Sequence, residues 1–233
     1  MCKGERVGKL EILSRRMLSV REAARQLRIP PTTLIHWLEG GERQGRWYEP
    51  VLRVEPTGSR DVTWGEMVEA RYLRAYRQKN VPMQQLRPFI SRLRDEFAVP
   101  YPLAHFKPFI GEGRRLLLEV QESVNLPGAL RLVYEAKTGQ LILDPRVTGF
   151  LDRVEFAEGG QREAERMYPA GRESPVVMDP RIASASPSVH GVRTEILGEL
   201  ANADVPVEII AADFNLPVSL VRSAVAYEWT NAA

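Results

Sequence analysis

The sequence predicts a mainly α-helical protein with small β elements, in the α+β class, with a winged helix-turn-helix near the N-terminus and a helical bundle at the C-terminus. Apolar residues recur at helical spacing in both terminal regions, short strand-like segments occupy the middle, and Gly or Pro separates the elements. With 233 residues, 44% of them hydrophobic, the chain can bury a core in one or two domains. We expect an N-terminal domain (1–98), a connector with short β-strands (99–173) and a C-terminal helical domain (174–233).

Residues 18–40 have the pattern of two short helices joined by a tight turn. Ser19 is followed three residues later by Glu22, which is the signature of a capping box at the start of the first helix. Pro31 suits the first position of the second helix, and Gly40 suits its end. The pattern therefore predicts a helix-turn-helix.

A short basic helix after a tight turn is suited to entering the DNA major groove. The second helix buries one face, so Thr32, Thr33 and His36 are expected to point outward and to contact DNA. Five arginines from the same region are also predicted to bind DNA: Arg21, Arg43, Arg46, Arg53 and Arg60. The alternative is a purely structural helix pair, which would show the same apolar stripe.

A β-hairpin is expected shortly after the second helix. Residues 51–54 read as a short strand, Gly58 as the turn, and residues 61–63 as the return strand. A hairpin at this position would be a wing, with Arg53 and Arg60 along its edge, where minor-groove or phosphate contacts occur. The alternative is that these arginines are exposed without contacting DNA.

Two longer helices are predicted after the hairpin. Thr63 and Glu66 form a second capping-box signature for a helix that continues to about residue 78. Residues 83–97 carry apolar side chains at helical spacing. The basic residues of this second helix are interpreted as a solvated outer face: Arg87, Arg92 and Arg94.

The middle of the chain is predicted to be an irregular connector with short strands. Strands are expected at 115–120, 140–143 and 154–156, a strand or a helix at 130–134, and a turn at 137–139. Residues 141–147 and 176–182 share one pattern, a short strand closed by Asp-Pro and followed by Arg. Because Asp before Pro favours an extended conformation, these two strands could pair within the chain or across a dimer.

The final sixty residues predict three helices, at about 195–203, 205–214 and 218–229. From residue 174 onward the chain has 3 basic and 7 acidic side chains. Repulsion from phosphates would weaken DNA binding by such a unit. We therefore interpret it as protein-binding or dimer-forming.

Charge is distributed unevenly along the chain. Residues 1–116 contain 22 Lys and Arg against 13 Asp and Glu, a net charge of +9, whereas residues 117–233 contain 10 against 17, a net charge of −7. A basic first half suits a polyanionic partner, and an acidic second half suits a different partner. The alternative is that the surface charge has drifted without a functional cause.

Several function classes find no support in the sequence. Cys2 is the single cysteine, and His36, His105 and His190 lack metal-ligand spacing, so neither a disulfide framework nor a metal site is expected. No nucleophile motif or paired carboxylates are apparent, so we expect no enzyme, no catalytic residue and no cofactor. Without a signal peptide or a bilayer-length apolar run, the expected location is cytoplasmic, with no membrane contact.

Two segments resemble known families. Residues 18–61 resemble the DNA-binding head of MerR-type winged-helix regulators, and the residues up to about 97 resemble the helices that follow it. Residues 175–229 are similar to a short bacterial domain found in antitoxins. The residues that carry this second resemblance are Val177, Asp179, Pro180, Arg181, Ile182, Pro187, Val189, Gly191, Arg193, Ala211, Phe214, Val221, Ala224 and Tyr227. The order of the two modules resembles a VapB-type antitoxin of a VapBC toxin–antitoxin pair.

Two positions depart from these families. Residues 184–186 lack the small glycine that is usual after Arg181, which leaves the local turn open. His36 stands where such DNA-binding heads frequently have Arg, which leaves the operator sequence open.

The resemblance implies two tasks. One is binding of promoter DNA as a homodimer on a palindromic site, and the other is inhibition of a cognate PIN-domain ribonuclease toxin. Such a toxin uses a carboxylate cluster with a divalent metal, and Arg162, Arg166 and Arg172 could occupy those carboxylates. The alternative for these three residues is ordinary linker charge. The alternative function is a MerR-like transcription regulator with a ligand-sensing C-terminal region and no toxin partner.

Overall fold

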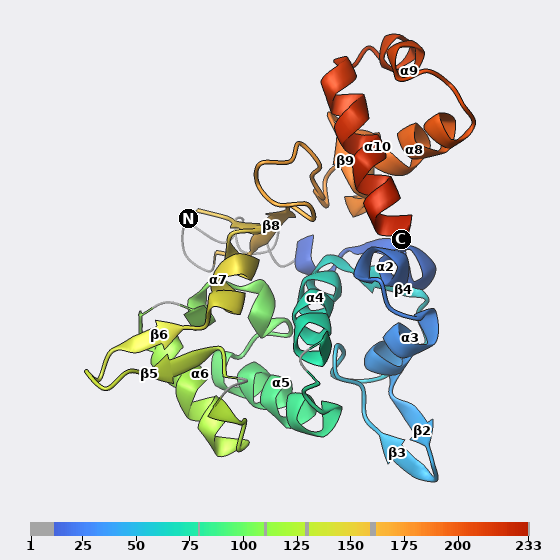
Figure 1. Cartoon of the computed structure of the whole chain (residues 1–233). Helices are drawn as coiled ribbons and strands as arrows, with labels where there is room; N and C mark the ends of the chain where they lie inside the picture. The colour runs from blue at the N-terminus through green and yellow to red at the C-terminus, as the bar shows by residue number, and fades with distance from the viewer. Residues whose placement is uncertain (1–11, 79, 110, 129–130, 159–161, 233) are drawn as a thin grey trace, which may run out of the picture. The chain divides into compact units, whose positions relative to one another are not determined.

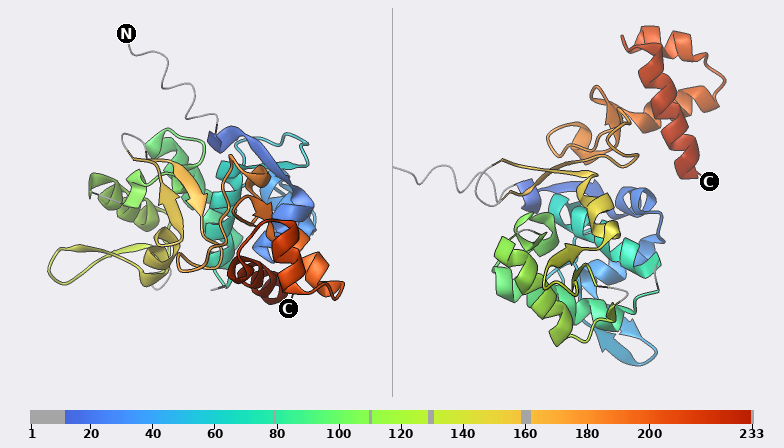
Figure 2. Two further views of the ribbon diagram at one scale, coloured as in Figure 1. Left: turned by 90° about the horizontal axis from the view of Figure 1, so that it is seen from above. Right: turned by 60° about the vertical axis from the view of Figure 1, so that its left-hand side comes forward.

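The computed structural model describes residues 12–78, 80–109, 111–128, 131–158 and 162–232. Contacts divide the chain into two compact units of the α+β class, drawn in Figures 1 and 2. The N-terminal unit comprises Met1–Leu151 and Phe156–Ala164, and the C-terminal unit comprises Asp152–Glu155 and Glu165–Ala233. Most of the middle region packs with the N-terminal helices in this division.

The N-terminal unit is built from helices and two-stranded antiparallel sheets. In chain order its elements are β1 (Arg16–Ser19), α2 (Val20–Leu27), α3 (Pro31–Glu39), β2 (Gly41–Arg43), β3 (Arg46–Tyr48), β4 (Asp61–Thr63), α4 (Trp64–Gln78), α5 (Met83–Phe97), the short 3-10 helices η1 (Pro102–Ala104) and η2 (Lys107–Phe109), α6 (Gly111–Ser123), β5 (Val133–Glu135), β6 (Leu141–Leu143) and α7 (Pro145–Leu151). The strand pairs are β1 with β4, β2 with β3, and β5 with β6.

The helix pair α2–α3 begins as its sequence predicts. The backbone N–H of Glu22 donates to Oγ of Ser19 at 3.2 Å, and the backbone N–H of Ser19 donates to the Glu22 carboxylate at 2.9 Å. These two bonds complete the capping box and satisfy backbone donors that the first turn leaves free. Pro30 precedes α3 as its N-cap, and Pro31 is its first residue. The buried residues that join the two helices are Val20, Ala23, Ala24, Leu27, Leu34, Trp37 and Leu38.

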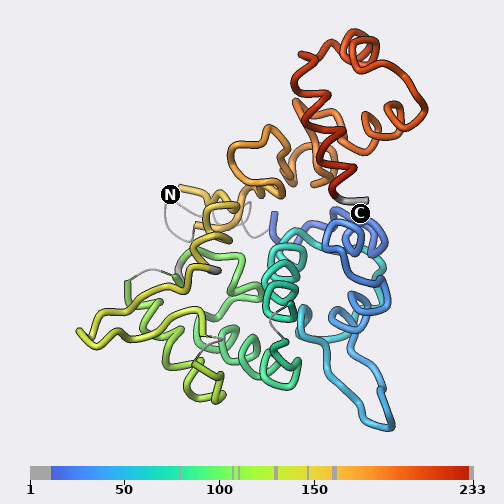
Figure 3. Tube along the Cα trace, viewed as in Figure 1, coloured from blue at the N-terminus to red at the C-terminus, as the bar shows by residue number. Residues whose placement is uncertain are grey.

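The hairpin lies earlier in the chain than the sequence analysis predicts. Strands β2 and β3 pair directly after α3, with Arg43 opposite Arg46. Gln44 and Gly45 at the tip both have left-handed backbones, with φ of 52° and 72°, as a type I′ hairpin turn requires. Figure 3 shows this ribbon extending away from the helices of its unit.

The predicted hairpin of residues 51–54 with 61–63 is wrong. Strand β4 pairs with β1, not with residues 51–54, which form bends. The physical reason is burial: Val51, Leu52 and Arg53 all point into the unit, so this segment cannot alternate between an inner and an outer face as an exposed strand does.

Gly40 connects α3 to the hairpin in a conformation that requires glycine. Its φ is +71°, and a Cβ atom there would lie 2.3 Å from the backbone oxygen of Tyr48. The hairpin can therefore start immediately after the last turn of α3.

The two longer helices form where the sequence places them. At the start of α4, Glu66 N–H donates to Oγ1 of Thr63 at 3.2 Å, and Thr63 N–H donates to the Glu66 carboxylate at 2.7 Å. The two helices are separated at Asn80, which has a left-handed φ of 59°. The indole N–H of Trp64 donates to the backbone oxygen of Ala164 at 2.7 Å, which ties a distant part of the chain to α4.

In the middle region one predicted strand is wrong. Residues 115–120 belong to helix α6, where Leu117, Leu118 and Val120 are buried. A short apolar run is compatible with either a strand or a helix by pattern alone. Here the run forms a helix whose apolar side chains are buried. The buried side chain of Gln121 then bonds the next strand, accepting from Leu132 N–H at 2.6 Å and donating to the Val133 oxygen at 3.0 Å.

The remaining middle strands form at or close to their expected positions, as β5, β6 and β7 (Val154–Phe156), and β7 pairs with β8 (Ala164–Met167). The repeated Asp-Pro-Arg strands do not pair with each other within the described chain. Strand β6 pairs with β5, whereas Val177 pairs with Ser188 and Met178 pairs with Met167.

The C-terminal unit contains the three helices expected from the sequence. Its elements after β8 are the 3-10 helix η4 (Ala183–Ala185), the strands β9 (Ser188–Val189) and β10 (Val192–Arg193), and the helices α8 (Thr194–Asn202), α9 (Val207–Asp213) and α10 (Val218–Ala232). Their shared core consists of Val176, Val189, Leu197, Ile210, Ala211, Val221, Ala224 and Val225.

By length and composition, none of the described helices could cross a membrane alone. Helix α9 and residues 218–230 of α10 pass that test only when they are taken together, across a bend of 114°.

Candidate nucleic-acid interface

The predicted DNA-binding residues lie at several separate places in the N-terminal unit. Thr33, His36 and Arg43 line one groove beside α3. Arg21 and Arg60 are exposed at the start of α2, where Val20 N–H donates to the backbone oxygen of Arg60 at 2.8 Å. The exposed residues Thr32 and Arg46 lie on α3 and on the hairpin, and Arg53 is buried elsewhere.

The groove has a volume of about 560 Å³ and lies between α3, the hairpin and the junction of α4 with α5. Its lining residues are Thr33, His36, Trp37, Arg43, Gln44, Tyr48, Arg77, Pro82, Met83, Gln84 and Arg87. Among these described residues three are arginines and none is acidic. The groove is therefore electropositive.

His36 is held by polar contacts on both ring nitrogens. Nδ1 lies 3.1 Å from the backbone oxygen of Gly40, and Nε2 lies 3.5 Å from Nη2 of Arg87. Since a carbonyl oxygen only accepts, Nδ1 carries the proton and Nε2 presents its lone pair to the guanidinium. Burial, together with the nearby charges of Arg87 and Arg43, lowers the pKa of His36, so the ring is neutral at pH 7.

The hairpin presents a basic face and an aromatic face. Arg43 and Arg46 are directly opposite each other and share one side, where the guanidinium of Arg46 lies 5.6 Å from the ring centre of Tyr48. Trp47 points to the other side and is 58% exposed, with its indole N–H donating to Glu49 at 3.0 Å. The cross-strand partner of Trp47 is Glu42, so this side of the hairpin combines an aromatic with acidic side chains. The exposed position of Trp47 became recognisable only once the hairpin was located.

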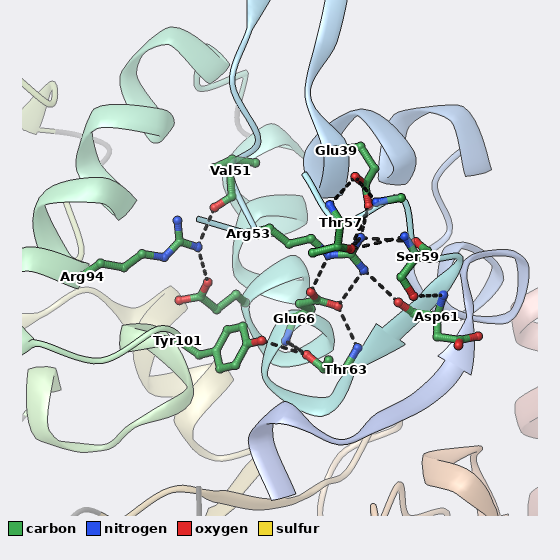
Figure 4. A network of polar contacts seen from close by, with 12 residues as sticks. Glu39, Val51, Arg53, Thr57, Ser59, Asp61, Thr63, Glu66, Arg94 and Tyr101 are labelled. Atoms are coloured by element: carbon green, nitrogen blue, oxygen red, sulfur yellow. Dashed lines mark hydrogen bonds and ion pairs between the residues drawn. The ribbon is translucent and has the colours of Figure 1, made fainter. Parts of the chain in front are cut away.

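The location expected for Arg53, on an exposed strand edge, is wrong. Its side chain is 7% exposed and donates Nε to the Glu66 carboxylate at 2.7 Å, Nη2 to the Asp61 oxygen at 2.8 Å, and Nη1 to Thr57 Oγ1 at 2.7 Å. It also forms an ion pair with Glu39 at the end of α3 (Figure 4). Although burial opposes it, the contacts with Glu66 raise the pKa of Arg53.

Glu39 completes this network from the end of α3. Its Oε2 accepts the backbone N–H groups of Thr57 at 2.8 Å and Gly58 at 2.9 Å. The loop before β4 is thereby tied to α3, and Arg53 ties both to α4 (Figure 4). The network joins α3, α4 and the loop before β4 to one another, and so fixes the position of the end of α3.

A second buried carboxylate lies one turn further along α4. Glu69 accepts from Arg94 Nη2 at 3.2 Å and from Leu103 N–H at 3.2 Å. Burial raises the pKa of Glu69 to about 7, against the opposing effect of Arg94. Arg94 also donates to the backbone oxygen of Val51 at 2.7 Å, so this arginine has partners within the unit and does not belong to a purely solvated face.

The three arginines predicted to contact a toxin differ in their surroundings. Arg162 is exposed, with its guanidinium 4.2 Å from the ring centre of Phe106. Arg172 donates to the backbone oxygens of Asp152 at 2.6 Å and Val154 at 3.0 Å. Arg166 is engaged in an ion-pair cluster of the C-terminal unit.

That cluster is centred on Asp179. The buried carboxylate accepts from Arg166 Nε at 2.7 Å and from Arg181 Nε and backbone N–H, both at 2.9 Å. Arg166 also donates to Glu155 at 3.2 Å. Although burial opposes it, the hydrogen bonds from Arg181 and Arg166 lower the pKa of Asp179. The Asp-Pro-Arg motif is thereby held in a tight turn.

Among the described residues, no group of three or more His, Cys, Asp or Glu side chains is arranged to hold a metal ion. An apolar cavity of about 30 Å³ lies against α4 and α7, lined by Tyr72, Ala75, Tyr76, Leu132, Val147 and Phe150.

Comparison with known proteins identifies relatives along nearly the whole chain, although no protein-family profile matches it. The uncharacterized protein Rv2308 of Mycobacterium tuberculosis is 31% identical over 225 residues, which cover 93% of this chain and 91% of Rv2308. A candidate antitoxin of the same organism, VapB45, is 28% identical over 226 residues, which cover 89% of this chain and 92% of VapB45.

The fold also resembles that of a solved structure. The crystal structure of Rv2018 from Mycobacterium tuberculosis matches with a TM-score of 0.67 and 25% sequence identity, and the match covers 90% of this chain and 97% of Rv2018. Both units therefore take part in the similarity.

Proposed function

The chain belongs to the same protein family as Rv2308 of Mycobacterium tuberculosis, and from this premise we propose that it is the antitoxin of a bacterial toxin–antitoxin pair. The similarity to VapB45 carries the proposal, because that protein is named as a candidate antitoxin and the match extends over both units. In this proposal the toxin is a PIN-domain ribonuclease that the chain neutralises by direct binding.

The second part of the proposal is repression of the chain's own operon. Helices α2 and α3 with the β2–β3 hairpin would act as a winged helix-turn-helix of MerR type, with α3 in the major groove and the hairpin beside it. The exposed side chains of Arg43 and Arg46 and the electropositive groove support this role. Two copies would bind a palindromic promoter site.

A gel-shift titration with the operon's promoter fragment tests the DNA-binding part. We expect the double variant Arg43→Ala/Arg46→Ala to bind at least tenfold more weakly at physiological salt, because two phosphate neutralisations are lost. Arg222→Ala is the matched control, since Arg222 is an exposed arginine of the acidic C-terminal unit. Equal affinities of the double variant and the wild type would contradict this role for the hairpin.

Co-expression with the product of the adjacent gene, followed by pull-down and a growth assay, tests the antitoxin part. We expect the chain to be recovered in a complex and to relieve growth arrest. Of the three arginines proposed for the toxin contact, Arg162 is exposed and Arg166 pairs with Asp179. Arg162→Glu should therefore weaken rescue more than the control Arg222→Glu. An adjacent product that neither binds nor arrests growth would contradict the proposal.

The alternative of a regulator that senses a small molecule is less well supported. The relative that is named as a candidate antitoxin matches along both units, including the C-terminal unit to which the alternative assigns ligand sensing. We therefore place the antitoxin role first.

A further inference from the structure

The hairpin of β2 and β3 has a second face, opposite its basic face. Glu42 is directly opposite Trp47 in the paired strands, so these two side chains lie on one side of the ribbon, and Arg43 and Arg46 lie on the other. Glu49 joins the first side through its hydrogen bond with the indole of Trp47. We call Glu42, Trp47 and Glu49 the tryptophan face. All three residues are exposed, on a hairpin that projects from the helices of its unit (Figure 1).

The indole ring of Trp47 lies beside two carboxylates. Its N–H donates to Oε1 of Glu49 at 3.0 Å, which fixes the orientation of the ring and places one carboxylate at its edge. Glu42 approaches from the paired strand, where directly opposite residues have Cβ atoms about 4.5–5.5 Å apart. Trp47 is nevertheless 58% exposed, so the ring is open to a partner molecule.

The chemistry of the tryptophan face selects a cationic protein surface. An indole ring attracts an arginine or lysine side chain that lies within about 6 Å of its centre, and neighbouring carboxylates accept hydrogen bonds from the same cation. The two carboxylates repel phosphates, so this side does not suit the DNA that the opposite side is proposed to bind. Tryptophan is also among the residues that contribute most to protein–protein binding.

We propose that the tryptophan face docks on the RNA-binding surface of the ribonuclease toxin, where the indole and the two carboxylates take the places of a base and of phosphates. A ribonuclease holds RNA with cationic side chains at the phosphates and with planar side chains stacked on bases. Its substrate surface is therefore complementary in charge to this face. The proposal rests on the antitoxin role proposed above and adds a toxin contact in the N-terminal unit.

The first test removes the ring. The purified full-length chain and its variants are titrated into the product of the adjacent gene by isothermal calorimetry. We expect Trp47→Ala to raise the Kd about thirtyfold, the effect of an interface hot spot. Tyr134→Ala is the matched control, because Tyr134 is an exposed aromatic on the β5–β6 hairpin of the same unit. Equal Kd values for Trp47→Ala and the wild type would overturn this proposal alone, whereas a wild type that does not bind would overturn the antitoxin role as well.

The second test reverses one charge. Glu42 is chosen because the charge of Glu49 also acts on Arg87. We expect Glu42→Arg to weaken toxin binding at least about tenfold, mainly through a lower association rate, because complementary charges steer association. Glu119→Arg makes the same change of net charge at an exposed position of α6. Equal effects of the two variants would show that net charge acts rather than the tryptophan face, and would overturn the proposal.

Two further measurements separate toxin contact from folding and from DNA contact. Trp47→Ala should keep the wild-type thermal melt, because the side chain is exposed. It should also keep the wild-type affinity for the promoter fragment in gel shifts, because no cation is removed from the opposite side. A variant that loses promoter affinity as strongly as toxin affinity would show that the ring supports the whole hairpin, and the proposed toxin contact would be wrong.

A charge exchange identifies the occupant. Each basic toxin residue that RNA binding requires is changed to Glu, and the toxin variants are titrated with Glu42→Arg. We expect one of them to bind Glu42→Arg more tightly than the wild-type toxin does. If no exchange restores binding, the tryptophan face does not contact the RNA-binding surface. Sedimentation of the chain without toxin tests a second copy as the occupant. Loss of a dimer in Trp47→Ala would assign this face to that contact and overturn the proposal.

Discussion

The two units use the same charged groups in opposite arrangements. In the N-terminal unit one arginine, Arg53, is surrounded by two carboxylates and is 7% exposed. In the C-terminal unit one carboxylate, Asp179, is surrounded by two arginines whose side chains are 37% and 43% exposed. If Arg53 is removed, the buried carboxylate of Glu66 loses its counter-charge without access to solvent. The two arginines around Asp179 are partly exposed and can be hydrated when that carboxylate is removed. The first network is therefore the more sensitive of the two.

The arginines of the N-terminal unit differ in the same way, since some are paired inside the unit and others are exposed. Arg53 joins α3 to α4, and Arg94 joins the segment after the hairpin to α5, so both arginines have partners within the unit. Arg43 and Arg46 project from the hairpin. The net charge of the first half of the chain therefore overstates the charge that a partner would meet, because part of it is neutralised inside the unit.

The largest effect is expected from Arg53→Met. Removing this cation leaves Glu66 and Glu39 without a counter-charge, and breaking a buried pair in this way typically costs about 3–5 kcal/mol. We expect a loss of this size in the free energy of unfolding from urea denaturation followed by tryptophan fluorescence, because Trp37 and Trp64 are buried in the same unit. Arg60→Met is the control, since Arg60 is exposed in the same loop. A change of less than about 1 kcal/mol, the scale of a surface ion pair, would show that solvent reaches the network.

A smaller effect is expected from Asp179→Asn. The amide cannot accept all the bonds that the carboxylate accepts from Arg166 and Arg181, and each lost bond to a charged group is worth about 1–3 kcal/mol when buried. Because both arginines are partly exposed, we expect the low end of that range. Denaturation followed by circular dichroism measures it, with Arg222→Gln as the control. A loss in the free energy of unfolding equal to that of Arg53→Met would show that the two networks are equally sensitive to the loss of their central charge.

The pH dependence of stability should have opposite signs at Glu69 in the N-terminal unit and at Asp179 in the C-terminal unit. The folded-state pKa of Glu69 is raised to about 7 from 4.5, so its contribution to stability is present below pH 4.5 and is lost as the pH rises through about 7. The folded-state pKa of Asp179 is lowered from 3.8, so its contribution is present above that value and is lost as the pH falls through the folded pKa.

Glu69→Gln sharpens this contrast, because the amide can still accept from Leu103 N–H but does not titrate. We expect the variant to lose the decline in stability between pH 5 and pH 8, measured by urea titration at several pH values. An unchanged pH profile would show that Glu69 remains ionised in the folded chain across this range.

The smallest effects are expected at the exposed arginines of the start of α2. Arg21→Ala and Arg60→Ala should each reduce the slope of log affinity against log salt by about 0.9 if each residue neutralises one phosphate. Stability should change by less than about 0.5 kcal/mol, as for surface positions. Gel shifts at four salt concentrations measure the slope. Slopes equal to that of the wild type would show that these two residues do not neutralise DNA phosphates.

Local signals in the sequence were sufficient for helices α2 to α5 and α8 to α10, but not for α6 and α7. The capping boxes at Ser19 and Thr63, the proline at the start of α3 and the helical spacing of the last sixty residues each depend on residues within one or two turns. Such interactions form in the same way whatever the rest of the chain does. The α+β class and the order of the helices at both ends were therefore predictable.

Longer-range contacts decided the rest. Residues 115–120 could be strand or helix by pattern alone, and the hairpin could have used residues 41–48 or 51–63. Arg53 is buried because Glu39 and Glu66 are brought to it from 14 and 13 residues away. Arg87 faces His36 from 51 residues away. No local pattern distinguishes these arginines from exposed ones.

By itself, the sequence determined where the helices of the two ends of the chain lie, the basic character of the first half and the acidic character of the second. Only the tertiary structure decided which arginines are available to a partner, because that depends on which carboxylates and rings the fold places beside each guanidinium. The free energy of a charged side chain is set by its surroundings in three dimensions, and those surroundings come from distant parts of the chain.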